Sequence, residues 1–185
     1  MIKEDRQLVE NLLAGDDSVF EKLLKKYLKP VYNFLYQITN DRSALDDLTQ
    51  ATFIKVWKNL HRLDTSKSFK AWLFTIAKNT AYDYLKKKKT TPFSFFENTK
   101  GYNKLDEIEE DKILPDEILE RKDMASELGE KLEEIPGQYK IILLMHYKED
   151  LTLLEISEIL GVPYNTIKSQ QQRALLSLKK AILGN

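Results

Sequence analysis

Apolar residues recur every three or four positions through most of the chain, as they do along one side of α-helices. In the first half, this pattern predicts four helices: one over residues 3–13, one capped by Asp16 or Asp17, one capped by Asp41 or Ser43, and one from Phe69 to Lys89. Pro30 falls inside the second of these and predicts a kink.

The periodic pattern stops after Lys89, where Pro92, Gly101 and Pro115 act as helix breakers. We expect residues 90–115 to form an acidic, flexible linker. Helical spacing then returns over residues 116–134, 138–147 and 152–160 and in the last segment. The sequence therefore predicts an all-α protein with two small helical domains, an N-terminal bundle of residues 1–89 and a C-terminal four-helix domain of residues 116–185.

Composition narrows the class of protein further. The 185 residues contain no cysteine and only two histidines, His61 and His146, which are not at a metal-pair spacing, so we expect no disulfide, metal or cofactor. Neither a secretory signal nor an apolar run long enough to span a bilayer is visible, so we expect a cytoplasmic protein without membrane insertion. The formal net charge is zero, but residues 97–134 hold 14 acidic and six basic residues, so both ends of the chain are basic. Basic ends are compatible with a polyanionic partner.

The fourth predicted helix carries the first candidate chemistry. Phe69, Trp72, Leu73, Ile76 and Ala77 form its expected buried stripe. Lys70, Phe74, Lys78, Tyr82 and Lys86 follow at four-residue steps and alternate cations with rings. Cations attract phosphates and rings stack on unpaired bases, so this ridge suits a nucleic acid with exposed bases. A core helix with a solvated lysine face is the alternative.

Two shorter features flank that ridge, and each has two interpretations. The polar loop Leu63–Ser68 could hydrogen-bond the edge of an extruded base, or could simply cap the next helix. Asp47, Gln50 and Ile54 share one face of the third helix, which could be a docking surface or a solvated face.

The C-terminal segment has the pattern of a helix-turn-helix. Thr152 can cap a short helix that ends at Leu160, Gly161–Pro163 forms a turn, and a last helix starts at Asn165 or Thr166. The expected outward side chains near its start are Tyr164, Asn165, Lys168, Ser169, Gln170, Gln172 and Arg173. Lysine and arginine can contact phosphates or guanine, and glutamine can pair with adenine, although an ordinary helical hairpin would look similar.

These two blocks together resemble the extracytoplasmic-function (ECF) group of bacterial RNA polymerase sigma factors. The first block has Asp47-Leu48, Gln50, Phe53 and Trp57, then Phe69, Trp72-Leu73, Ile76-Ala77 and Asn79. The second has Glu155-Ile156, Leu160-Gly161-Val162, Thr166-Ile167-Lys168-Ser169 and Arg173-Ala174. The resemblance covers almost the whole chain and implies a promoter-specificity subunit that is not an enzyme.

The resemblance also implies partners and residue roles. Asp47, Gln50 and Ile54 would bind the clamp helices of core RNA polymerase, and the apolar cleft around Ile141–Met145 would hold its flap tip helix. Within the loop, Leu63, Asp64, Ser66 and Lys67 would join Asn79 in a pocket for a flipped base of the minus-ten element, beside a melted strand contacted by Lys70, Trp72, Lys78, Tyr82 and Lys86. Promoter DNA at minus thirty-five would face Tyr164, Asn165, Thr166, Lys168, Ser169, Gln170, Gln172 and Arg173. An anti-sigma factor is a further implied partner.

Three residues depart from the family's pattern: Ala51 stands where an acid is common, Gln170 where an arginine is usual, and Gln171 where an aliphatic residue is usual. We expect Ala51 to weaken the polymerase contact and Gln170 to remove one phosphate contact. A helix-turn-helix regulator that acts without polymerase is the alternative function. A nucleic-acid enzyme is poorly supported, because no clustered metal ligands, phosphate-binding loop or nucleophile motif is visible.

Overall fold

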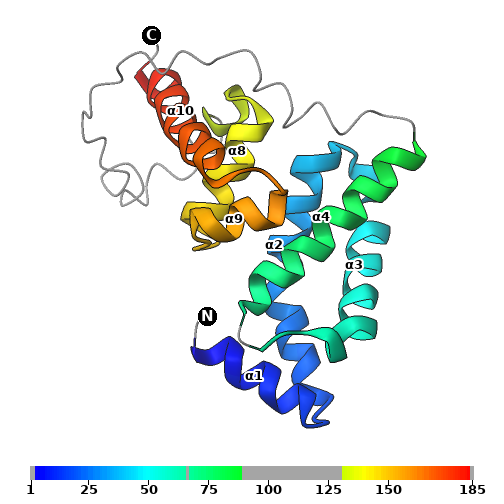
Figure 1. Ribbon diagram of the computed structural model, residues 1–185. Helices are drawn as coiled ribbons and strands as arrows, with labels where there is room; N and C mark the ends of the chain where they lie inside the picture. Colours follow the sequence, from blue (N-terminus) through cyan, green and yellow to red (C-terminus); the bar gives the residue numbers. More distant parts are fainter. Residues whose placement is uncertain (1–2, 66, 89–130, 184–185) are drawn as a thin grey trace. The chain divides into compact units, whose positions relative to one another are not determined.

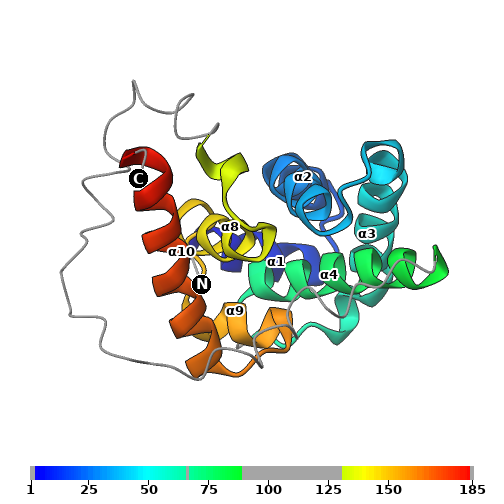
Figure 2. The ribbon, with the colours of Figure 1, turned by 90° about the horizontal axis from the view of Figure 1, so that it is seen from above.

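The computed structural model describes residues 3–65, 67–88 and 131–183, and these residues form helices and turns with no strand among them (Figures 1 and 2). The predicted all-α class is therefore confirmed. The predicted linker, most of the predicted helix over residues 116–134, and Ser66 lie outside the described residues. By proximity of Cα atoms the chain divides into two compact units, one of Met1–Pro92 with Leu154–Gly161 and one of Phe93–Leu153 with Val162–Asn185.

The first unit is a helical bundle. Its elements from the N-terminal part of the chain are α1 (Lys3–Leu13), α2 (Ser18–Thr39), the 3-10 turn η1 (Arg42–Ala44), α3 (Leu45–Asn59), the 3-10 turn η2 (Leu60–Arg62) and α4 (Phe69–Lys87). Helices α2, α3 and α4 contact one another, and α1 packs on α2. Their shared core is apolar and includes Leu23, Val31, Leu35, Val56, Phe69 and Leu73, all nearly or completely buried.

The helix boundaries follow from local chemistry. Gly15 ends α1 with a φ of +98°, a conformation that glycine adopts without steric cost. Asp16 Oδ1 accepts hydrogen bonds from the backbone N (3.2 Å) and hydroxyl (2.6 Å) of Ser18, at the start of α2. Asp41 likewise accepts from the Ser43 backbone N at 3.1 Å, as one of the two predicted caps. Helix α2 continues through Pro30 as a single element, and a bend at that residue stays a prediction.

Polar contacts tie the helices of this unit together at three places. Asp5 of α1 is buried and accepts from Tyr27 Oη at 2.5 Å and from Lys26 Nζ at 2.6 Å. Lys55 of α3 donates from Nζ to Thr80 Oγ1 at 3.1 Å on α4. Asp41, which precedes η1, accepts from Tyr84 Oη at 2.6 Å near the end of α4. Each contact holds α1 or α4 at a fixed position on its neighbour.

The remaining described elements are a helical turn over residues 131–134, α8 (Gly137–Leu143), the π-helical turn η5 (Leu144–Lys148), α9 (Leu153–Leu160) and α10 (Tyr164–Leu183). Helix α8 packs against α10, and Ile135, Leu143, Ala174 and Leu178 form a buried apolar cluster between and beside them. Among the described residues, no helix combines the length and apolar character that crossing a bilayer requires.

The apolar run Ile141–Met145 contributes to the core of this part of the chain. Ile141, Ile142, Leu143 and Met145 are all buried, at most 4% exposed. The resemblance implied a cleft around this run that would hold a polymerase helix, and that role stays a prediction. Four of the five side chains are already core residues, because α8 and η5 carry apolar residues on more than one side.

Candidate functional site

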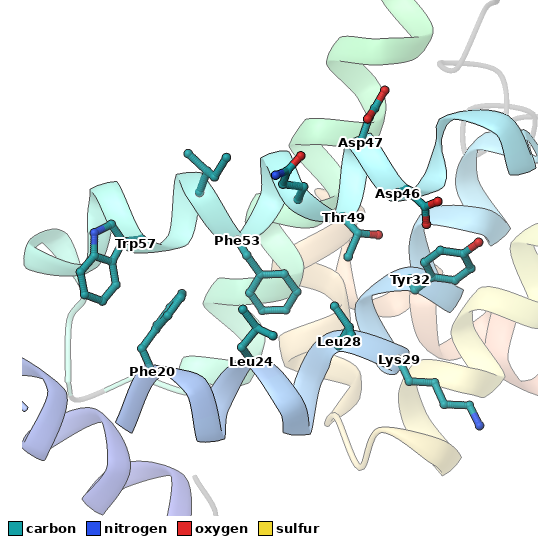
Figure 3. A pocket seen from close by; sticks show the side chains of 12 residues that line it. Phe20, Leu24, Leu28, Lys29, Tyr32, Asp46, Asp47, Thr49, Phe53 and Trp57 are labelled. Atoms are coloured by element: carbon teal, nitrogen blue, oxygen red, sulfur yellow. The ribbon is translucent and has the colours of Figure 1, made fainter. Parts of the chain in front are cut away.

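An apolar groove of about 840 Å³ lies between α2 and α3 (Figure 3). Its lining residues are Phe20, Leu24, Leu28, Lys29 and Tyr32 from α2, and Asp46, Asp47, Thr49, Gln50, Phe53, Ile54 and Trp57 from α3. Three of them are large apolar side chains exposed to solvent: Leu28 (44%), Ile54 (46%) and Trp57 (44%). A contiguous exposed apolar surface of this kind is typical of a site that a partner covers.

Helix α2 forms one wall of the groove because it has two apolar ridges. The ridge with Leu23, Tyr27 and Val31 faces the core, and a second, with Phe20, Leu24 and Leu28, continues at four-residue steps beside it. Because α2 contacts α1, α3 and α4, the width of its apolar surface does not by itself show which ridge is exposed.

Helix α3 forms the other wall and carries all three expected docking residues. Asp47, Gln50 and Ile54 are exposed and line the groove together, which agrees with the expected common face. Asp46, Phe53 and Trp57, which were not assigned to it, share the same wall (Figure 3).

The groove has two chemically different ends. Trp57 packs edge-on against Phe20, with ring centroids 4.8 Å apart, at one end. Asp46 and Asp47 lie at the other end (Figure 3). Between them, Thr49 Oγ1 is one of the few buried side-chain atoms of the described residues without a hydrogen-bond partner. This arrangement suits an amphipathic partner with apolar side chains along its length and a basic group near the carboxylates.

The outward side of α4 carries a second candidate surface. Trp72, Thr75, Asn79, Tyr82 and Lys86 follow at alternating three- and four-residue spacings, which places them within about 80° around the helix. Each is exposed or half-exposed. We call this set the α4 stripe; Thr75 is the member that the sequence analysis missed.

Two members of the expected cationic ridge do not belong to that surface. Phe74 is 1% exposed and packs edge-on against Phe34, with centroids 5.0 Å apart. Lys70 lies about 160° around the helix from Trp72. The physical reason is that four-residue steps drift by about 40° each, so the predicted ridge starts on the side of α4 that packs on α2 and α3.

Lys78 and Tyr82 form a pair at the edge of the α4 stripe. Lys78 Nζ lies 5.6 Å from the centroid of the Tyr82 ring, within the range of a cation–π contact. Burial lowers the pKa of Lys78 and raises the pKa of Tyr82 to about 12. The phenol is therefore neutral at physiological pH and presents an aromatic surface without added negative charge.

The loop before α4 serves at least as a helix cap. Ser68 Oγ accepts a hydrogen bond from the Ala71 backbone N at 3.2 Å, and the Lys67 backbone N donates to the Asp64 carbonyl at 3.0 Å. Asn79 is exposed but lies about 16 Å further along the helix axis than Ser68. The loop and Asn79, expected to share one pocket, thus lie at two places along α4.

The residues of α10 that were expected to contact duplex DNA differ in how exposed their side chains are. Tyr164, Asn165, Lys168 and Gln172 are exposed, whereas Thr166, Ser169 and Arg173 are half-exposed. Gln170 is only 1% exposed, so its predicted outward position is wrong. It lies on the buried stripe with Ile167, Ala174 and Leu178, to which its three- and four-residue spacings assign it. The neighbouring Gln171 donates from Nε2 to Tyr147 Oη at 2.7 Å.

Two protein-family models match the chain, one in its N-terminal half and one in its C-terminal half. Residues 23–91 match the family model of sigma-70 region 2, and residues 125–178 match that of sigma-70 region 4. The ECF RNA polymerase sigma factor SigW of Bacillus subtilis is 26% identical over 179 residues, which cover 96% of each chain. The chain belongs to the ECF sigma factors.

Other ECF sigma factors show the same end-to-end similarity. SigM of Bacillus subtilis is 29% identical over 160 residues, covering 86% of this chain and 92% of its own. Two solved structures share the fold. CnrH, solved with the cytosolic domain of CnrY, has a TM-score of 0.62 at 17% identity and 98% coverage of both chains. RpoE of Bartonella quintana, solved with the anti-sigma factor NepR, has a TM-score of 0.59 at 22% identity, covering 88% of this chain and 96% of its own.

Proposed function

We propose that this sigma factor directs transcription initiation as a promoter-specificity subunit with no catalysis of its own. It binds core RNA polymerase through the groove between α2 and α3, reads duplex promoter DNA with α10, and holds the melted strand along the α4 stripe. The observation that most directly supports this proposal is that Asp47, Gln50 and Ile54 line one exposed apolar groove. Residues that form one docking surface must lie together in this way.

The groove fits a helical polymerase element. Its apolar walls would cover a partner's aliphatic stripe, while Asp46 and Asp47 would pair with a basic side chain. Ile54 and Trp57 project into solvent from the α3 wall and are the side chains that a partner would desolvate most. Interface binding energy usually concentrates in a few such apolar and aromatic residues.

Strand capture rests on the α4 stripe. Extruding a base costs a few kcal/mol, and stacking on an aromatic ring contributes about 1–3 kcal/mol per base. The stacking free energy of the Trp72 and Tyr82 rings is therefore large enough to offset the cost of extruding about two bases. Lys78 and Lys86 would contact phosphates, while the loop Leu63–Ser68 and Asn79 would contact different nucleotides of the same strand.

We also propose an anti-sigma factor as regulator and the cytoplasm as the compartment. CnrH was solved with the cytosolic domain of CnrY bound, and the sigma factor RpoE with the anti-sigma factor NepR bound. A protein that covers the groove of this chain would prevent polymerase binding there. The proposal predicts competition between an anti-sigma factor and core polymerase for the same side chains.

The proposal is tested with reconstituted bacterial core polymerase. Ile54→Asp places a charge in the apolar groove, so we expect it to weaken core binding at least tenfold in a pull-down titration and to abolish promoter-dependent run-off transcription. Leu13→Asp is the matched control, because Leu13 of α1 is exposed to a similar extent (42%) and lies outside the groove. Equal binding by both variants and the wild-type chain would exclude the groove as the docking site.

A further inference from the structure

An exposed carboxylate lies at the edge of the α4 stripe. Asp83 is exposed, and it lies about 40° around the helix from Asn79 and about 60° from Lys86, both members of the stripe. A polyanionic strand that follows the stripe therefore passes close to a negative charge. Two like charges repel more strongly where water between them is displaced, so an uncompensated carboxylate here would oppose strand binding.

Lys55 of the neighbouring helix α3 supplies an ammonium group that faces this carboxylate. Its Nζ lies 3.3 Å from Asp83 Oδ2, and the side chains of Lys55 and Asp83 are 42% and 61% exposed. An ion pair this exposed contributes little to folding stability. Its main effect is on local charge, because the pair is close to neutral where Asp83 alone would carry a full negative charge.

A second contact fixes the position of the Lys55 ammonium. Nζ donates to Thr80 Oγ1 at 3.1 Å, and Thr80 is only 4% exposed. The Thr80 hydroxyl donates in turn to the Ile76 backbone carbonyl at 2.9 Å, so its one proton is committed and its oxygen is available to accept from Lys55. Thr80 directly follows Asn79, so the ammonium is held beside the stripe.

On these observations, and on the proposed function of strand capture along the α4 stripe, we propose that the ion pair between Lys55 and Asp83 sets how tightly the holoenzyme holds the melted strand. Lys55 belongs to the helix that forms the polymerase groove, but it acts on strand capture through Asp83, whose charge it neutralises. Asp83 limits the affinity for the strand, because it keeps the Lys55 ammonium from the phosphates.

The charges of the two partners predict effects of opposite sign. Lys55→Met keeps the aliphatic part of the side chain but leaves the Asp83 charge uncompensated, so the equilibrium constant for promoter opening should fall by roughly fivefold. Asp83→Asn removes the repelling charge and releases the ammonium toward the strand, so it should raise that constant by a similar factor. The double variant should lie close to the wild-type chain. A pair that served only folding would instead give a loss in both single variants.

The test uses holoenzyme reconstituted with core polymerase on a duplex promoter. Permanganate reactivity of unpaired thymines gives the equilibrium constant for opening at several salt concentrations. Its logarithmic dependence on salt should become shallower by about 0.7 in Lys55→Met and steeper by about 0.7 in Asp83→Asn, which corresponds to one phosphate of a single strand. Core binding in a pull-down and thermal melting should change little, because the pair is exposed.

Lys25→Met and Glu21→Gln are the matched controls. They break an exposed ion pair on α2, with Lys25 Nζ 2.6 Å from Glu21 Oε1, outside both the groove lining and the α4 stripe. Each should leave opening and its salt dependence as in the wild-type chain. Losses in both Lys55→Met and Asp83→Asn, or unchanged opening in both, would overturn the inference while leaving the proposed function intact. If wild-type holoenzyme opens no promoter, the proposed function fails and the inference fails with it.

Discussion

Gln170 is a buried carboxamide on an apolar stripe, and neither its Oε1 nor its Nε2 has a hydrogen-bond partner among the described residues. Leaving a buried polar group without a partner costs about 1–3 kcal/mol relative to an apolar group of the same shape. The residue next to it, Gln171, avoids this cost by donating to Tyr147. Two adjacent glutamines thus contribute oppositely to stability.

Replacing Gln170 should therefore stabilise the fold. Methionine has a similar length and no strong hydrogen-bonding group, so Gln170→Met should raise the free energy of unfolding by about 1–3 kcal/mol. Urea denaturation monitored by circular dichroism would measure the change. Gln172→Met, at an exposed position of the same helix, should not stabilise. A destabilised Gln170→Met variant would mean that the carboxamide has partners in solution.

The positions of Gln170 and Phe74 were both predictable from spacing, although residue type pointed elsewhere. Gln170 is spaced three and four residues from Ile167 and Ala174, and Phe74 lies next to the buried Leu73 on a helix that contacts two others. The sequence analysis gave residue type priority over helical position, and it therefore placed both side chains on the exposed side of their helices. The exposure of Asp47, Gln50 and Ile54 was predicted correctly, because Asp47 and Gln50 are polar and Ile54 follows them at helical spacing on the same face.

At the scale of elements, one carboxylate holds the end of α4. Asp41 Oδ2 accepts from Tyr84 Oη at 2.6 Å and from Lys88 Nζ at 2.5 Å, while Oδ1 accepts from Ser43. The hydrogen bond from Lys88, followed by those from Ser43 and Tyr84, holds the pKa of Asp41 well below its ordinary value. The same contact with Asp41 raises the pKa of Lys88.

This contact makes stability depend on pH in a defined direction. A carboxyl whose pKa is lowered by folding stabilises the fold above its unfolded pKa of about 3.9 and loses that contribution as pH falls below it. Asp41→Asn should therefore lower the melting temperature at pH 7, and the difference from the wild-type chain should shrink as the pH falls below about 4. Thermal melts at several pH values would measure it.

Tyr84→Phe is the companion variant, because it removes one hydrogen bond to Asp41 without removing the charge. It should lower the melting temperature less than Asp41→Asn at pH 7. An Asp41→Asn difference that stays constant from pH 7 to pH 3 would show that the carboxylate charge is not what stabilises this end of α4.

Most helices were predictable because their stop signals are local. Gly15 and Ser68 set boundaries within a few residues of the prediction, through a positive φ and a hydroxyl cap. The groove was not predictable in full. It depends on which side of α2 meets α3, and apolar spacing alone does not distinguish a core ridge from an exposed one.

For the whole molecule, the proposed division of labour separates polymerase binding from DNA melting. The groove uses α2 and α3, whereas the melted strand would lie on the α4 stripe. Lys55 connects α3 to α4 through Thr80 and also lies 3.3 Å from Asp83 Oδ2, so the two surfaces belong to one packed bundle. Substitutions at exposed positions of each surface should nevertheless affect one step and leave the other intact.

Tyr82 offers the clearest test of this separation. If its ring stacks on a melted base, Tyr82→Ala should reduce the open fraction of a duplex promoter by roughly tenfold, because stacking contributes about 1–3 kcal/mol per base. Tyr82→Phe keeps the ring and should retain opening, which separates stacking from the hydroxyl. Permanganate reactivity of unpaired thymines measures the open fraction, and a pull-down measures core binding, which should not change in either variant.

A promoter with a pre-formed bubble completes the test, since it needs no energy for base opening. At saturating holoenzyme, Tyr82→Ala should transcribe this template nearly as well as the wild-type chain does, because the missing stacking contribution no longer limits opening. Equal defects on the duplex and bubble templates, accompanied by weaker core binding, would instead indicate a folding defect, as Tyr82 is half-buried. An unchanged open fraction in Tyr82→Ala would remove this ring from the proposed strand path.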